Sequence, residues 1–127
     1  MTHTPPDPAG HKRHRPYRFG WYGDAGMGET LIQLILDGRK TASACPASEP
    51  EDIRAGETLV LIDKAGRERG RILVTRIETR RFDGFEAGLE GELGLPLERF
   101  REMFAAAEGR APRPDEPMRV THFELLP

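Results

Sequence analysis

The strongest local constraint on the fold is an amphipathic helix that ends abruptly at a glycine. Four apolar residues recur at positions i, i+4, i+7 and i+8 and therefore share one helical face: Met27, Leu31, Leu34 and Ile35. Gly38 suits the left-handed conformation that ends many helices. The small residues 41–44 that follow predict a short strand with room for a packed aromatic group or a ligand. We therefore expect Lys40 to lie against a packed surface.

The remaining elements predict a mixed α+β domain. A continuous apolar run at 58–62 predicts a strand buried on both faces, and the turn at 63–67 leads into a second strand at 71–79. Helical spacing returns within 82–94 and, more clearly, from Leu97 to Ala107, before a final strand at 119–126. With strands and helices in this order, an α+β arrangement is favoured over a doubly wound sheet.

Length and charge limit the classes of function. A chain of 127 residues predicts one folded domain, preceded by a flexible basic tail over residues 1–17. The net charge of −2 argues against tight, sequence-independent binding to long nucleic acid. The longest apolar run is too short to cross a membrane, so no membrane partner is expected. The single cysteine, Cys45, excludes an intrachain disulfide and fits a cytoplasmic location.

Four short motifs occur in a distinctive order along residues 18–126. They are an aromatic-glycine-acid element, a helix end with a nearby hydroxyl, a lead-in to the long strand, and an acidic segment before the last helix and strand: Phe19-Gly20-Trp21-Tyr22-Gly23-Asp24; Gly38-Arg39-Lys40-Thr41 with Ser43; Ala55-Gly56-Glu57; and Phe82-Asp83 with Leu89-Glu90-Gly91-Glu92 and Phe123-Glu124-Leu125. In this combination the chain resembles the ASCH domain family, which has a PUA-like fold.

The resemblance implies an open β-barrel of about six strands with flanking helices, formed by residues 18–127. It also implies a modified nucleoside or RNA as the partner. One branch of the family removes the acetyl group of N4-acetylcytidine, and there a lysine, a threonine and a glutamate serve the site. These positions match Lys40, Ser43, which keeps the hydroxyl, and Glu92. An arginine in the family's fuller pattern is replaced here by Cys45.

Five further residues are candidates for substrate binding. Trp21 and Tyr22 have side chains that could stack on a base or seal the barrel end. Arg39 and Thr41 flank the candidate lysine, although Thr41 also suits a purely structural role. Glu90 is the second choice for the catalytic glutamate after Glu92, because the acidic segment can be aligned with the family in more than one way.

The resulting hypothesis is a metal-independent amidohydrolase that needs no cofactor. Amide hydrolysis requires an attacking group, proton transfer to the departing amine and stabilisation of the oxyanion. At a helix C-terminus Lys40 favours its charged form, whereas deep burial would make it a base or nucleophile. A non-catalytic RNA-binding module and a ribonuclease are the alternatives. The sequence leaves the native substrate and the oligomeric state open.

Overall fold

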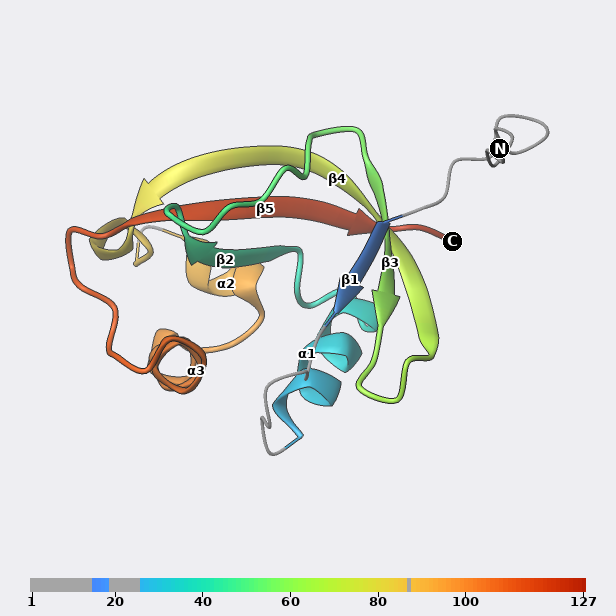
Figure 1. Ribbon diagram of the computed structural model, residues 1–127, viewed down its shortest axis with the longest axis horizontal. Helices are drawn as coiled ribbons and strands as arrows, with labels where there is room; N and C mark the ends of the chain where they lie inside the picture. The colour runs from blue at the N-terminus through green and yellow to red at the C-terminus, as the bar shows by residue number, and fades with distance from the viewer. Residues whose placement is uncertain (1–14, 19–25, 87) are drawn as a thin grey trace, which may run out of the picture.

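The computed structural model describes residues 15–18, 26–86 and 88–127. These ranges contain five strands, three α-helices and one short 3-10 helix (Figure 1). In chain order they are β1 (Arg15–Arg18), α1 (Met27–Leu36), β2 (Ala42–Pro46), β3 (Thr58–Ile62), β4 (Glu68–Arg81), the 3-10 turn Phe82–Gly84, α2 (Leu89–Leu93), α3 (Leu97–Glu108) and β5 (Pro117–Leu125). The predicted α+β class is confirmed.

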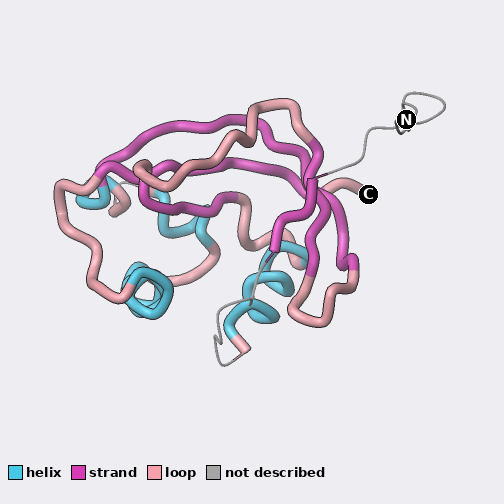
Figure 2. Tube along the Cα trace, viewed as in Figure 1, coloured by secondary structure: helices cyan, strands magenta, loops and turns pink. Residues whose placement is uncertain are grey.

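The strands form one curved sheet in the order β1-β3-β4-β5-β2. Strand β1 is parallel to β3, and the other neighbouring pairs are antiparallel. The long strands β4 and β5 run side by side and bend together, and α2 and α3 lie below β2 in the view of Figure 1. Figure 2 shows the same arrangement, with all helical segments on one side of the β4–β5 ribbon.

The sequence predicted an open barrel of about six strands, and the structure shows an open sheet instead. The described sheet has five strands, and β1 and β2 stand at its two ends without forming a ladder with each other. β1 pairs along its four residues with β3, and β2 pairs along its five residues with β5, but no main-chain pairing closes the described sheet into a barrel. A side-chain hydrogen bond between Tyr17 of β1 and Ser43 of β2 joins the two edges instead.

Strand β1 begins inside the segment predicted to be a flexible tail. Residues 15–17 pair with residues 59–61 of β3. Arg15 anchors the strand through ion pairs with Asp52 and with Glu57, whose Oε2 lies 2.7 Å from Arg15 Nε. Pro16 lacks an N–H group and fits a sheet edge, where one side of the strand needs no donor. A strand this short, with so few apolar residues, leaves no periodic pattern in the sequence.

Two apolar clusters fill the two parts of the curved sheet. One lies under α2 and α3 and includes Phe82, Phe85, Phe100 and Phe104 with Met118 and Val120. The other is centred on β3, where Leu59, Val60 and Leu61 are all buried, as the continuous apolar run predicted. No helix in the described part of the chain is long and apolar enough to span a membrane.

Gly94 fixes how closely α2 approaches the chain at Lys40. It follows α2 in the left-handed conformation, with a φ of 82°. A Cβ atom there would lie 3.0 Å from Lys40 Cβ and 3.1 Å from the carbonyl oxygen of Arg39. The position therefore requires glycine for backbone conformation and for space.

We expect Gly94→Ala to destabilise the protein by about 1–3 kcal/mol, because strain at positive φ adds to a tight contact. Gly91→Ala is the matched control, since Gly91 lies within α2 and has open space where its Cβ would be. There alanine should be neutral or stabilising by up to about 1 kcal/mol. Urea unfolding of both variants tests the contact, and equal stabilities would contradict it.

Candidate functional site

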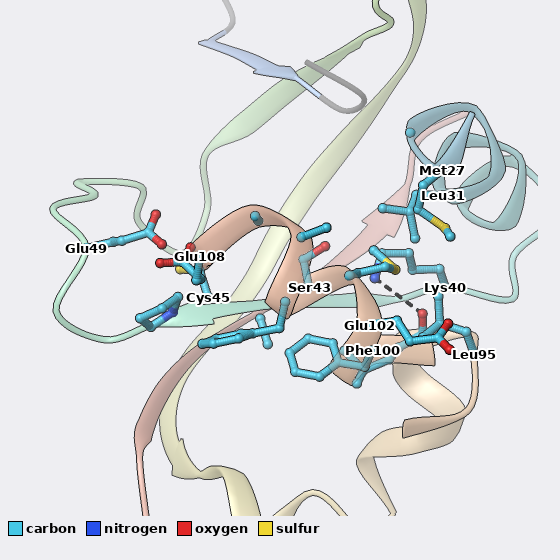
Figure 3. Close-up of a pocket in the computed structure, with 18 of the residues that line it drawn as sticks. Met27, Leu31, Lys40, Ser43, Cys45, Glu49, Leu95, Phe100, Glu102 and Glu108 are labelled. Carbon is cyan, nitrogen blue, oxygen red and sulfur yellow. Dashed lines mark hydrogen bonds between the residues drawn. The ribbon is translucent and has the colours of Figure 1, made fainter. Parts of the chain in front are cut away.

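A cavity of about 510 Å³ lies between the open edge of β2, helix α3 and the first turn of α1 (Figure 3). Tyr17 contributes from β1, and Leu93 and Leu95 from α2 and the residues after it. Its walls are mainly apolar, with Met27, Leu31, Phe100 and Phe104 among them. A volume of this size is typical of a pocket for a small organic ligand.

The turn that ends α1 places Lys40 in the lining of this cavity. Gly38 has a φ of 78°, as its predicted role in ending the helix requires. The Leu34 carbonyl then accepts hydrogen bonds from the N–H groups of Arg39, at 2.9 Å, and Lys40, at 3.0 Å. These bonds turn the chain back across the helix end. The expectation that Lys40 lies against a packed surface is confirmed, because only 5% of it is exposed.

The Lys40 amine is held by main-chain oxygens. Nζ donates hydrogen bonds to the carbonyl of Ala42, at 2.7 Å, and to that of Leu93, at 3.3 Å. Burial lowers the pKa of Lys40 from its ordinary value to about 7, because desolvation disfavours the ammonium form. A neutral amine has two hydrogens, which match the two carbonyl acceptors, and one lone pair that is left to act as a base or nucleophile.

Ser43 lines the same cavity as Lys40. Its side chain hydrogen-bonds to Tyr17, which also lines the cavity. Burial, the largest cause, raises the pKa of Tyr17, so the phenol remains protonated and can donate. With the phenol donating to Ser43 Oγ, the hydroxyl hydrogen of Ser43 is free, so the pair can supply one hydrogen-bond donor to an oxyanion.

The two candidate glutamates of α2 do not line the cavity. Glu92 Oε1 lies 3.6 Å from Nδ1 of the buried His122, and the Glu92 side chain is 41% exposed. His122 Nε2 lies 2.5 Å from Glu78 Oε2. Glu90 has a structural contact, because its carboxylate accepts a hydrogen bond of 2.8 Å from the N–H of Leu97 at the start of α3.

The other predicted binding residues lie in different places. Arg39 is exposed and is not among the residues that line the cavity. Thr41 is held through its main chain: its N–H donates to the Glu92 carbonyl at 2.8 Å, and its carbonyl accepts from Phe123 at 2.9 Å. Trp21 and Tyr22 lie outside the described residues. The structure therefore brings Lys40 and Ser43 together, but not the complete predicted set.

Four polar residues of the cavity were not predicted from the sequence: Tyr17, Glu49, Glu102 and Glu108. Tyr17 belongs to a strand with no periodic signal, and Glu49 lies in the polar loop after β2. Glu102 and Glu108 lie in α3, a helix that the sequence predicted. Their place at the cavity depends on how that helix packs beside β2, which the sequence pattern does not determine. The described residues contain no group of three or more histidine, cysteine, aspartate and glutamate side chains arranged for a metal ion.

The lowered pKa of Lys40 predicts a pH-dependent stability. Between about pH 7 and 10.5 the unfolded chain binds a proton at Lys40 that the folded chain does not bind. Stability should therefore rise with pH across this interval, by at most about 1.4 kcal/mol per pH unit. Lys40→Met should abolish this contribution and should stabilise the protein most at or below pH 7.

Urea unfolding at several pH values measures this effect. Lys64→Met is the matched control, because Lys64 is exposed and lies in the turn between β3 and β4. An identical pH dependence of the stability of the wild type and of Lys40→Met would show that burial does not disfavour the charged form of the Lys40 amine.

Comparisons with known proteins identify the fold. No family model matches the chain, and no curated protein matches it. Among solved structures, an ASCH domain from Lactobacillus crispatus JV V101 superposes with a TM-score of 0.71 at 17% identity, over 87% of this chain and 79% of that one. A DUF984 protein from Enterococcus faecalis V583 gives a TM-score of 0.69 at 22% identity, over 88% and 76% of the two chains.

A mutant of the ASCH protein from Zymomonas mobilis superposes less closely, with a TM-score of 0.59 at 12% identity over 76% of this chain and 63% of that one. At these identities the similarity establishes the fold. The chain therefore has the fold of ASCH domains, as its motifs predicted.

Proposed function

We propose that this chain binds a modified nucleoside or RNA base in the cavity beside β2 and hydrolyses an acylated exocyclic amine, as in N4-acetylcytidine, without a metal ion. The observation that carries the proposal is a buried amine and a hydroxyl, Lys40 and Ser43, in one cavity of about 510 Å³. Lys40, Ser43 and Glu92 are the residues that the resemblance to the amidohydrolase branch implies. Tyr17 is added because it lines the same cavity.

Lys40 acts as the general base in this proposal. Its neutral amine takes a proton from water, and the resulting hydroxide attacks the acyl carbon to form a tetrahedral oxyanion. The carbon–nitrogen bond then breaks, and the ammonium group returns the proton to the departing exocyclic nitrogen. Acetic acid and cytidine are the products, and the acid then releases its proton to water as acetate. A pKa of about 7 leaves the amine sufficiently basic to accept the proton and sufficiently acidic to return it.

Ser43 stabilises the developing oxyanion by donating its hydroxyl hydrogen, and Tyr17 orients Ser43 through their shared hydrogen bond. Glu92 enters the proposal as a positioning residue. Its main-chain carbonyl accepts from Thr41, and its position in α2 next to Leu93 helps to hold the carbonyl that receives the Lys40 amine.

Turnover of N4-acetylcytidine by single-site variants tests these roles. Lys40→Met should reduce kcat by about 10²-fold or more, as expected for a lost general base. Ser43→Ala should reduce kcat by about 10²-fold with little change in KM, because the donor acts on the oxyanion. Ser48→Ala is the matched control, since Ser48 is exposed in the loop after β2 and does not line the cavity.

Glu92→Gln distinguishes a positioning residue from a catalytic carboxylate. The substitution keeps the main chain, so turnover should fall by less than about 10-fold, far less than general base loss would cause. A loss as large as that of Lys40→Met would assign the base role to Glu92. If the wild type binds the nucleoside without turnover, the chain is a binding module. Full turnover in Lys40→Met would remove Lys40 from the mechanism.

The pH profile gives an independent test of Lys40. Because the neutral amine is the active form, kcat/KM should rise with pH through about 7 and then level off. This limb should disappear in Lys40→Met, whatever activity remains. An activity that instead rises near pH 4 would point to a carboxylate base.

A further inference from the structure

We propose that Glu49 and Glu108 make the cavity selective for an uncharged nucleoside or base, and that they exclude the phosphorylated forms, including a base within RNA. This inference rests on the proposed function and specifies its class of substrate.

Exposed carboxylates lie at the rim of the mainly apolar cavity. Three glutamates belong to its lining, Glu49, Glu102 and Glu108. Glu102 is paired with Arg99, whose Nη1 lies 2.6 Å from Glu102 Oε1, so Glu49 and Glu108 carry the negative charge. Among the described lining residues the single basic one is Lys40, whose amine is engaged by two carbonyl oxygens. Sites that accept phosphate groups usually present arginine, lysine or free main-chain N–H groups to them. The described lining contains no arginine, and its one amine lies deep against the main chain.

Arg119 contacts Cys45 of the lining, but its guanidinium donates to the carbonyls of Ala47, at 3.2 Å, and Glu49, at 2.7 Å. It also lies 3.6 Å from the carboxylate of Glu51.

Glu49 and Glu108 come together from the loop after β2 and from the last turn of α3, and Figure 3 shows their carboxylates side by side near Cys45. Burial and a hydrogen bond with Glu108 raise the pKa of Glu49. A hydrogen bond between two carboxyl groups requires one shared proton. With or without that proton, the pair keeps at least one negative charge at the cavity, and a ligand phosphate would be repelled by it.

One feature of the cavity favours an anion. The first turn of α1 contributes Met27 and Gly28 to the lining, and a helix N-terminus carries partial positive charge. Glu29 in the same turn is paired with Arg69 and adds no net charge.

Near Cys45 carboxylates outnumber the guanidinium of Arg119. They belong to Glu49, Glu51 and Glu108. The balance of the described groups there is therefore negative, and an uncharged ligand avoids the repulsion altogether.

The open edge of β2 offers neutral groups for such a ligand. Phe123 donates its N–H to the Thr41 carbonyl, and Ala47 donates its N–H to the Pro117 carbonyl. The main-chain N–H and C=O groups of the odd-numbered residues between 41 and 47 therefore point toward β5. In an antiparallel pair the intervening residues turn their main-chain groups away. The Ala42 carbonyl on that side accepts from Lys40, and Ala44 presents both an N–H and a C=O beside Ser43. An uncharged base edge with one donor and one acceptor matches this pair.

The test compares N4-acetylcytidine, its 5′-monophosphate and a short oligoribonucleotide that contains the same base. The wild type should hydrolyse the nucleoside with a kcat/KM at least about 10-fold above those of the monophosphate and the oligonucleotide. In the double variant Glu49→Gln/Glu108→Gln this ratio should fall toward one. Glu124→Gln is the matched control, because it removes one negative charge from the exposed end of β5, away from the cavity lining, and should leave the ratio unchanged.

Ionic strength provides a second measurement with the unmodified protein. Salt screens the repulsion between the cavity and a phosphate, so KM for the monophosphate should fall as salt is added, while KM for the nucleoside stays constant. A protein that attracts nucleic acid shows the opposite trend, because its affinity falls with salt.

Two results would overturn the inference in distinguishable ways. Hydrolysis of the nucleoside with an equal or higher kcat/KM for the monophosphate or the oligonucleotide removes the selectivity but leaves the proposed function intact. The absence of binding and turnover with all three compounds removes both.

Discussion

The buried amine of Lys40 is the interaction on which the site and its surroundings depend. Its two acceptors, the carbonyls of Ala42 and Leu93, belong to β2 and α2, so one side chain ties a sheet edge to the helix packed beside it. Main-chain carbonyls satisfy the amine without neutralising a positive charge. Burial in this setting therefore favours the uncharged amine, and the same contact that joins two elements also produces a basic nitrogen near neutral pH.

This arrangement explains why the sheet stays open at β2. A further strand paired with that edge would take the main-chain groups of Ala44 and would occupy the place of the cavity. The short strand β1 reaches the same region and stops, leaving Tyr17 to contact Ser43 through side chains. The open edge is thus a source of hydrogen-bonding groups for a ligand in the cavity between β2 and α3.

The sequence predicted the parts of the structure that depend on local patterns. The helix end at Gly38, the buried strand at 58–62 and the helix before Gly109 all carry periodic or conformational signals in neighbouring residues. The inward position of Lys40 followed from the small residues next to it. Strand β1 and the pair of Glu49 with Glu108 carry no such signal, because they form between residues far apart in the chain. The direction of Glu92 depends on how α2 rotates against the sheet, which its spacing alone did not determine.

The acidic lining and the neutral lysine constrain each other. A carboxylate in contact with Lys40 Nζ would stabilise the ammonium form, raise its pKa and remove the lone pair that the proposed reaction needs. Burial alone accounts for the shift at Lys40, and in the described residues the hydrogen bonds of Nζ go to carbonyls rather than to a carboxylate. No carboxylate among the described residues forms an ion pair with Lys40 Nζ, so the carboxylates of the lining can repel an anionic ligand without stabilising the ammonium form. The cavity can exclude anionic ligands and still contain a basic nitrogen, because main-chain carbonyls, and not a glutamate, hold the Lys40 amine.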